Sequence, residues 1–183
     1  MGKIWIISDL HFCHNKDFIY GKRGFESIAE HDEAIIKNWN KLVSAEDDVY
    51  ILGDSMLNDN VAGCACLRRL AGHKHMLIGN HDSRERVAQY EQLFNTDVLG
   101  CAHTMKYKGY TLYLSHYPTL TDNHDGDKPL NRRVINLCGH THTTDRWSDF
   151  DKGLIYHVDV DAHDMKPTLL DDIIEEIKEK VNE

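Results

Sequence analysis

Short apolar runs and amphipathic stretches alternate along the first half of the chain. The apolar runs have strand character, and the stretches between them carry apolar residues three to four positions apart, which is typical of helices. The predicted strands are Lys3–Ser8, Asp48–Leu52 and His75–Ile78, and the predicted helices are Glu26–Val43, Asn60–Ala71 and Ser83–Phe94. Strands that alternate with helices predict an α/β protein with a parallel sheet.

The second half of the chain is richer in strands. Val98–Met105 and Tyr110–Ser115 flank a turn at Lys108 and Gly109, and they predict a β-hairpin. Because the chain has no internal repeat, no low-complexity tract and no linker, we expect a single domain over residues 1–183. The remaining expected segments are loops at Phe12–Gly24 and Thr121–Asn131, strands at Arg133–Cys138 and Leu154–Val160, and a helix at Thr168–Val181.

Five of the predicted strands end in side chains that can bind metal or carry protons. Ligands of open α/β sheets bind outside the carboxyl ends of the strands, so these side chains predict a site at that edge. Residues two apart in an extended segment point the same way, which lets Asp9 and His11 reach one cation. In chain order the exits carry Asp9 with His11, Asp54, Asn80 with His81 and Asp82, His116, and His140 with His142.

The chemistry of these side chains indicates which cations they bind. The candidate ligands offer nitrogen and oxygen and no sulfur, which favours Mn first, with Fe, Zn, Co or Ni as alternatives, over Mg or Ca. Seven donors are too many for one tetrahedral ion, and they suit two divalent ions that share a carboxylate. The seven are Asp9, His11, Asp54, Asn80, His116, His140 and His142.

Other histidines and cysteines receive no such role. His73 and His75 precede the strand exit, so we interpret them as structural or surface residues. Cys64 and Cys66 lie two apart on a predicted helix, which points them about 200° apart, and they cannot bind one zinc ion together from that helix. We interpret them as buried apolar cysteines.

Composition limits the classes of function. The 183 residues are 41% hydrophobic and 28% charged, as in a globular protein, and no apolar run reaches the roughly 20 residues of a membrane span. Five cysteines without regular spacing favour a reduced compartment, and we expect a cytoplasmic protein without a membrane partner. The net charge of -9 disfavours long nucleic acid as a partner. The oligomeric state stays open.

The strand-exit motifs together resemble those of the calcineurin-like metallophosphoesterases. The order and spacing of the set carry the resemblance, which spans about three-quarters of the chain. The motifs are DLH at Asp9, GD at Asp54, GNHD at Asn80, a lone histidine at His116 and GHTH at His140. A compact bacterial and phage-type branch of that family is similar in three further segments: DLHFCHN from Asp9, WN at Trp39 and VDAHDMKP from Val160.

The resemblance implies both an architecture and a set of metal ligands. It implies a four-layer α/β/β/α sandwich of two mixed sheets flanked by helices. It also implies that Asp54 bridges two ions, one held by Asp9, His11 and His142 and the other by Asn80, His116 and His140. The chain departs from the branch at Cys13, Ser55 and Asp159, where glycine, phenylalanine and glycine are common; none of the three is an implied ligand.

Two such ions, about 3.5 to 4 Å apart, can hold a bridging hydroxide that attacks phosphorus in line with the leaving group. His81 is the candidate proton donor to the leaving oxygen, and Asp82 can accept a hydrogen bond from His81 and orient its ring. His14 and Arg23 can contact a phosphate, as can Arg132, Arg133 and Arg146, although each can equally be a solvated cation.

These features predict a dinuclear metal-dependent phosphohydrolase that cleaves a phosphodiester or phosphomonoester of small or moderate size. A metal-dependent nuclease is one alternative, and the net charge disfavours it. The other alternative is a non-catalytic interaction scaffold that keeps the fold. The presence of His81 beside a complete ligand set favours the enzyme.

Overall fold

The computed structural model describes residues 2–121, 128–148 and 154–182. Its first sheet has the strand order β10-β1-β2-β3-β4. The strands β1 to β4 run parallel, and β10 pairs antiparallel with β1. The bounds are Ile4–Ile7 for β1, Asp48–Leu52 for β2, His73–Leu77 for β3, Thr96–Gly100 for β4 and Thr168–Leu169 for β10.

The second sheet is also mixed and has the order β5-β6-β7-β9-β8. Its central strands β6, β7 and β9 run parallel, and the outer strands β5 and β8 pair antiparallel with β6 and β9. The bounds are Ala102–Tyr107 for β5, Tyr110–Ser115 for β6, Val134–Cys138 for β7, Trp147–Ser148 for β8 and Ile155–His157 for β9.

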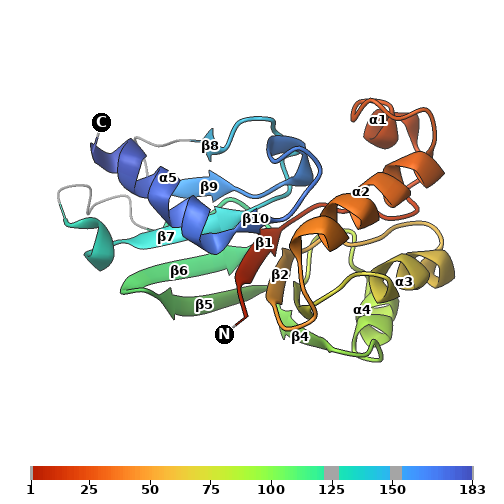
Figure 1. Cartoon of the computed structure of the whole chain (residues 1–183), viewed down its shortest axis with the longest axis horizontal. Coiled ribbons are helices and arrows are strands. Elements are labelled where there is room, and N and C mark those ends of the chain that lie inside the picture. Colours follow the sequence, from red (N-terminus) through yellow and green to blue (C-terminus); the bar gives the residue numbers. More distant parts are fainter. Residues whose placement is uncertain (1, 122–127, 149–153, 183) are drawn as a thin grey trace.

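Helices cover both parts of the molecule. α2, α3 and α4 gather on one side beside the first sheet, and α5 lies across strands of the second (Figure 1). The α-helices are α1 Asp17–Tyr20, α2 Ile28–Leu42, α3 Asn60–Arg68, α4 Arg84–Tyr90 and α5 Leu170–Asn182, and 3₁₀ turns occur at Leu130–Arg132 and Val160–Ala162. The predicted α/β fold with two mixed sheets and flanking helices is confirmed.

Alternation along β1 explains how the layers are joined. Trp5 and Ile7 belong to an apolar cluster with residues of α2, α3 and α4, whereas Ile6 belongs to a second cluster with residues of β6, β7 and α5. Side chains alternate between the two faces of a strand, so one buried strand contributes to both clusters. The first sheet is therefore covered by helices on one face and by the second sheet on the other.

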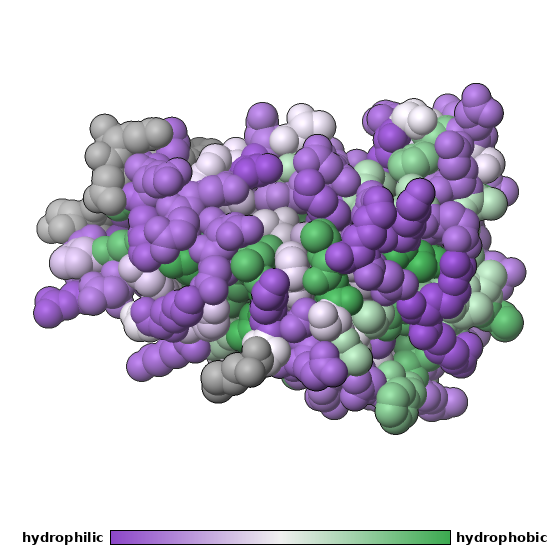
Figure 2. Space-filling model, viewed as in Figure 1, coloured by the Kyte–Doolittle hydropathy of each residue, from purple (hydrophilic) through white to green (hydrophobic). Residues whose placement is uncertain are grey.

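The surface follows from this burial pattern. The face that carries α2 and α5 is dominated by hydrophilic residues, as expected for the outer sides of amphipathic helices (Figure 2). Within the residues that the structure describes, no helix is long and apolar enough to cross a membrane.

The predicted hairpin strand Val98–Met105 is wrong in one respect. The structure divides this segment into β4, at the edge of the first sheet, and β5, at the edge of the second. The break falls at Gly100, whose φ of +95° is a left-handed conformation that glycine adopts without strain. A continuous apolar pattern thus conceals the point where the chain leaves one sheet for the other.

Several other boundaries also differ from the sequence prediction. The predicted strand Leu154–Val160 is shorter: β9 covers only Ile155–His157, and a 3₁₀ turn begins at Val160. The predicted helix Thr168–Val181 begins two residues later, because Thr168–Leu169 pairs with β1. The loop Phe12–Gly24 contains the short helix α1, and the loop Thr121–Asn131 lies partly outside the described residues.

Candidate metal centre

The predicted donors meet where the two sheets join. They follow the carboxyl ends of β1, β2 and β3 in the first sheet and of β6 and β7 in the second. Two backbone hydrogen bonds lock the sheets together at this rim: Ser8 N donates to Val158 O at 3.0 Å, and Val160 N donates to Ser8 O at 3.1 Å. Donors that are far apart in the sequence therefore face one another.

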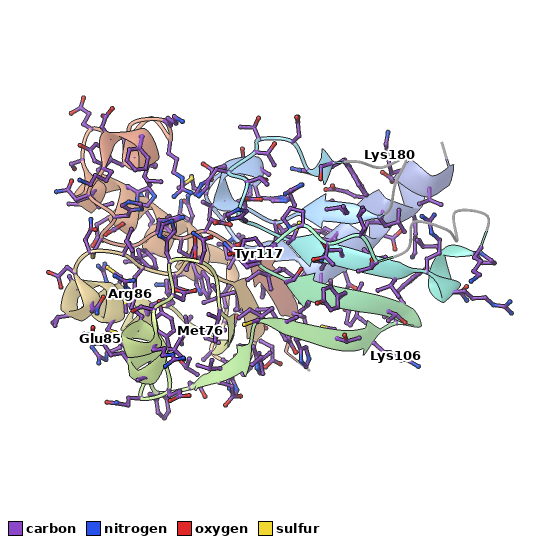
Figure 3. All side chains as sticks on the ribbon, turned by 180° about the vertical axis from the view of Figure 1, so that it is seen from behind. Met76, Glu85, Arg86, Lys106, Tyr117 and Lys180 are labelled. Carbon is purple, nitrogen blue, oxygen red and sulfur yellow. The ribbon has the colours of Figure 1, made fainter. Side chains whose placement is uncertain are left out.

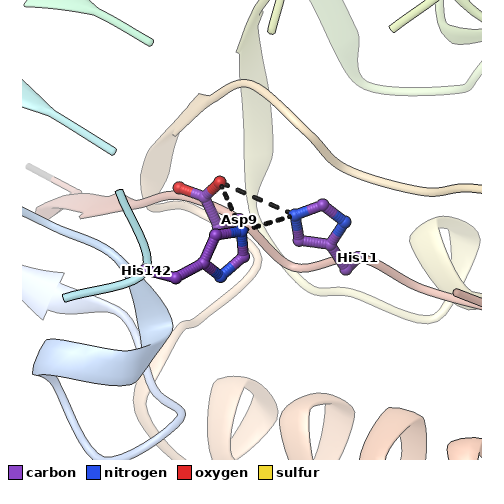
Figure 4. A group of neighbouring side chains, drawn as sticks. All are labelled: Asp9, His11 and His142. Carbon is purple, nitrogen blue, oxygen red and sulfur yellow. Dashed lines mark hydrogen bonds and ion pairs between the residues drawn. The ribbon is translucent and has the colours of Figure 1, made fainter. Parts of the chain in front are cut away.

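Asp9, His11 and His142 form the first group of donors (Figure 4). Nε2 of His11 and Nε2 of His142 are 3.1 Å apart. Oδ1 of Asp9 lies 3.7 Å from Nε2 of His11 and 3.6 Å from Nε2 of His142. Three ligand atoms from two sheets thus point at one small volume.

Asp54 links this group to a second one. Its Oδ2 lies 3.7 Å from Nε2 of His11 and 3.5 Å from Nε2 of His116. Nε2 of His116 is also 2.9 Å from Oδ1 of Asn80. Asp54 and His116 are both buried. Nδ1 of His116 lies 2.9 Å from Leu52 O, and this contact fixes the orientation of the ring. The Asp54 carboxylate therefore lies between the two sets of donors.

His140 borders the second group. Its ring packs edge-on against His116, with centroids 5.0 Å apart, and against Tyr117 at 4.7 Å. Tyr117 lies near the centre of the rear view (Figure 3). The backbone nitrogen of His140 donates to Oδ2 of Asp9 at 2.8 Å. All seven predicted donors are thus at the rim, with His140 attached to both groups.

A buried oxygen without a partner shows that this arrangement fits cations. Oδ2 of Asp9 accepts hydrogen bonds from Ser8 Oγ at 2.6 Å and from His140 N at 2.8 Å. Within the described residues, Oδ1 of Asp9 is buried and has no hydrogen-bond partner. Burying an unpaired carboxylate oxygen is costly, and a divalent cation among the facing imidazoles would remove that cost.

Burial also keeps two of the donor imidazoles in the form that binds metal. Burial lowers the pKa of His11 to about 4, although Asp9 opposes the shift, and burial lowers the pKa of His140 as well. At neutral pH both rings are then neutral, as a metal ligand must be. Burial would raise the pKa of Asp9, but the nearby imidazoles of His11 and His142 hold it below its ordinary range.

Backbone strain is concentrated at the same positions. Five of the seven donors adopt a left-handed φ, which costs about 1–3 kcal/mol each for a residue other than glycine. These donors and their φ values are Asp9 (59°), His11 (51°), Asp54 (53°), His140 (75°) and His142 (50°). Such strain persists where the surrounding structure enforces it, and it is typical of functional sites.

Two motif glycines make room for the carboxylates. A Cβ at Gly79 would collide with the Asp54 carboxylate and would lie 2.7 Å from its backbone nitrogen. A Cβ at Gly139 would collide with Ser8 Oγ and Asp9 Oδ2. The glycines of GNHD and GHTH are therefore needed, because the Asp54 and Asp9 carboxylates lie too close to the backbone of these two positions to leave room for a side chain there.

The structure places His81 beside the donor groups, as predicted, but it corrects the role predicted for Asp82. Nε2 of His81 is 3.9 Å from Oδ2 of Asp54, and its side chain is 40% exposed. The Asp82 carboxylate instead accepts hydrogen bonds from Asp54 N and Gly79 N, both at 2.8 Å, and from Tyr90 Oη at 2.8 Å. Asp82 therefore orders the loop beneath the donors and does not orient the His81 ring.

His14 and Arg23 also hold other side chains in place. Nδ1 of His14 lies 3.1 Å from Nδ1 of His11, so His14 fixes the ring that carries a predicted ligand. Arg23 pairs with both oxygens of Asp161, at 2.9 and 2.7 Å, and contacts His31 at 2.8 Å. Both residues line the pocket, but most donors of the Arg23 guanidinium are used within the protein.

A pocket of about 680 Å³ lies over the donors. Phe18, Ile19 and Lys22, from α1 and the residues after it, line one part of its wall, and Thr141 and Thr144 line another. None of the three arginines near GHTH, Arg132, Arg133 and Arg146, is among the lining residues that the structure describes. Arg146 pairs with Glu176 of α5 at 2.6 Å, so its predicted contact with substrate is not supported.

Sequence reasoning missed two residues that position donors. Ser8 holds Oδ2 of Asp9, and Asp161 lies 3.1 Å from Nδ1 of His142. Burial would raise the pKa of Asp161, but its bonds to His142 and Arg23 hold it below the ordinary range. The one sequence signal for Asp161 was its place in the VDAHDMKP segment, because nothing in the local pattern brings it to GHTH.

The fold and the donor set define an α/β protein with a candidate metal centre, and comparison with known proteins identifies its family. The model of the calcineurin-like phosphoesterase superfamily domain matches residues 3–158. The chain therefore belongs to the calcineurin-like phosphoesterase superfamily, as the resemblance of its motifs implied.

Relatives in an archaeon and a phage agree with this assignment. Uncharacterized protein MJ1445 of Methanocaldococcus jannaschii is 33% identical over 147 residues, which cover 75% of this chain and 81% of that protein. The gene 66 protein of Mycobacterium phage D29 is 29% identical over 203 residues, and the match covers 100% of this chain and 98% of that protein. The crystal structure of AQ665 from Aquifex aeolicus, a protein of unknown function, shares the fold with a TM-score of 0.70. The two sequences are 23% identical, and the match covers 96% of this chain and 99% of AQ665.

Proposed function

We propose that the protein is a dinuclear metal-dependent phosphoesterase that hydrolyses a phosphodiester or phosphomonoester of small or moderate size. Membership of the phosphoesterase superfamily supports the reaction class. The observation that carries the proposal is the place of Asp54, whose Oδ2 lies within 3.7 Å of Nε2 of His11 on one side and 3.5 Å of Nε2 of His116 on the other. One carboxylate between two donor groups suits a pair of cations.

The distances support a division of the donors between two cations. Asp9, His11 and His142 offer ligand atoms within 4.8 Å of one another, and so do Asp9, Asp54 and His116. Asn80 extends the second set through its contact with His116. We assign His140 to the second cation because its ring packs against His116. All of these donors are nitrogen or oxygen, which favours manganese, iron, zinc, cobalt or nickel.

The chain's own residues then have distinct tasks. When bound, two divalent cations supply Lewis acidity to the phosphate and acidify the attacking water. His81 donates a proton to the leaving oxygen, because its ring is partly exposed in the pocket and adjoins Asp54 without belonging to either donor group. Arg23 and Asp161 hold His142, and His14 holds His11, so that the imidazoles keep their orientation.

The pocket favours a compact substrate. Its volume of about 680 Å³ is in the usual range for small-molecule sites. Phe18 lies at the pocket with 57% of its surface exposed, and Lys22 offers a cation beside it. We assign these two residues to the organic part of the ester and to phosphate charge. A pocket of this size also favours the enzyme over a scaffold without activity.

A hydrolysis assay with defined metal content tests the proposal. Protein stripped with a chelator and reloaded with manganese is mixed with bis(p-nitrophenyl) phosphate and with p-nitrophenyl phosphate. We expect turnover of at least one ester by the loaded wild type, none by the stripped protein, and a loss of at least about 100-fold in Asp54→Asn. Asp97→Asn is the matched control, since Asp97 is exposed and pairs with His73 far from the pocket.

Two results would overturn the proposal. One is full turnover by the stripped protein, because the cations would then have no part in the reaction. The other is equal activity in Asp54→Asn and Asp97→Asn at the same metal content. Rates with manganese, iron, zinc, cobalt and nickel, measured on both esters, identify the preferred metal and the preferred ester class.

A further inference from the structure

Three side chains from separate elements form a second group of metal-ligating atoms. Cys13 follows β1, Asp32 lies in α2, and Cys66 lies in α3. One ligand atom of each residue lies within 4.8 Å of the other two. Asp32 is buried and both cysteines are half-buried, so the cluster lies just beneath the surface.

We propose that Cys13, Asp32 and Cys66 bind a thiophilic divalent cation of the zinc type. Two thiolates and a carboxylate are ligands that zinc takes, and a water molecule would complete a tetrahedral site. Manganese prefers harder donors, so this site and the nitrogen and oxygen centre differ in the metals that they select. The function proposed for the pocket does not enter this inference.

The carboxylate of the cluster is held in a fixed orientation. Oδ2 of Asp32 accepts a hydrogen bond from Cys13 N at 3.0 Å, and Oδ1 is 2.8 Å from Nδ1 of His31. Nε2 of His31 in turn contacts Arg23 at 2.8 Å. Metal-binding carboxylates are commonly oriented by such outer partners, which raise the affinity of the site.

The two thiols lie close together. The Sγ atoms of Cys13 and Cys66 are within 4.8 Å of each other. The interpretation of both Cys64 and Cys66 as buried apolar cysteines is correct in burial for Cys64 and wrong for Cys66, which is half-buried. Cys64 is buried with its Sγ 3.4 Å from Gln89 Oε1, whereas Cys66 meets Cys13, which is 53 positions away in the sequence.

A cation here would clamp the segment that carries two donors of the main centre. Cys13 has a φ of +61°, and Asp9 and His11 are left-handed as well. At Cys13 this strained segment meets Asp32 of α2 and Cys66 of α3. Bonds from one cation to Cys13, Asp32 and Cys66 would tie the segment to both helices and help to hold its strained conformation.

Cobalt spectroscopy tests the site without depending on catalysis. The full-length protein is reduced with a phosphine, stripped of metal and titrated with Co²⁺. A sulfur-to-cobalt charge-transfer band in the near ultraviolet reports thiolate ligation alone. The main centre and the surface group Asp48, His73 and His75 contain no sulfur, so neither can produce this band. The wild type should show the band, and zinc should abolish it by displacing the cobalt.

Matched serine variants on one helix distinguish this site from cobalt binding by any other cysteine of the chain. Cys66→Ser should lose the band and bind cobalt at this site at least tenfold more weakly, whereas Cys64→Ser should keep it. Cys13→Ser should also lose it. Thermal unfolding followed by circular dichroism shows that each variant is folded.

The proposal is overturned if reduced wild-type protein gives no band, or if the band survives in folded Cys66→Ser. A Cys13–Cys66 disulfide that persists in the phosphine would also overturn it, because the sulfur atoms would then not be thiolates. These outcomes are independent of the hydrolysis assay, so the failure of one proposal does not affect the other.

Discussion

Oδ2 of Asp161 lies 3.1 Å from Nδ1 of His142 and leaves Nε2 of that imidazole facing Oδ1 of Asp9 at 3.6 Å. Nη2 of Arg23 donates to the same Asp161 oxygen at 2.7 Å and lies 3.2 Å from Nδ1 of His142. Although burial alone would lower the pKa of His142, the bond to Asp161 raises it. The Arg23–Asp161 pair therefore decides which nitrogen of His142 faces the donor group.

Removing the charge of Asp161 should weaken metal binding without removing a ligand. Outer partners of metal-binding histidines contribute about 10- to 100-fold in affinity, so we expect a loss of that size in Asp161→Asn. Asp164→Asn is the matched control, because Asp164 is exposed and pairs with Lys166. Manganese titration by calorimetry measures both, and equal affinities in the two variants would contradict the role of Asp161.

Replacing His81 should affect chemistry and not metal content. A positioned proton donor contributes about 10²- to 10⁴-fold, and it matters most when the leaving group is a poor one. We expect His81→Ala to lose kcat strongly on an alkyl phosphoester and much less on a p-nitrophenyl ester. Metal analysis should show the same content as wild type. A uniform loss on both esters would exclude His81 as the proton donor.

The left-handed backbone at His142 predicts a difference between two variants that lose the same imidazole. Glycine tolerates the φ of +50°, whereas alanine does not. We expect His142→Gly to exceed His142→Ala in free energy of unfolding by about 1 kcal/mol, because relief of strain outweighs the added freedom of the unfolded chain. Urea denaturation of the metal-free proteins measures this, and a more stable alanine variant would refute it.

Asp82 should act on stability, because its carboxylate accepts bonds from Asp54 N, Gly79 N and Tyr90 Oη. Asp82→Ala leaves these buried groups unpaired, and we expect it to lower the free energy of unfolding by about 3 kcal/mol. Tyr90→Phe removes only one of these bonds and should cost about 1 kcal/mol. Chemical denaturation gives both values; a cost in Asp82→Ala no larger than in Tyr90→Phe would contradict this assignment.

The main donors could be found from sequence because their signal is local. Each follows an apolar strand directly, and parallel strands of a sheet present their carboxyl ends at one edge. Asp9, Asp54 and Asn80 illustrate this rule within the first sheet. This rule does not predict that donors of the second sheet meet those of the first. The family resemblance provided that prediction.

The residues that were missed depend on contacts between distant segments. Asp161 reaches His142 only because a 3₁₀ turn at Val160–Ala162 follows the bridge between Ser8 and Asp159. Cys66 meets Cys13 only because α3 packs beside the segment after β1. Periodicity describes neither relationship, and for the same reason it did not show that β4 and β5 belong to different sheets.

The most direct test is electron paramagnetic resonance of the protein titrated with manganese. If the seven donors hold two cations around Asp54, the spectrum should show an exchange-coupled pair that saturates at two ions per chain. Asp54→Asn should lose the coupling. A wild-type spectrum of isolated manganese alone, or saturation at one ion per chain, would contradict the dinuclear centre.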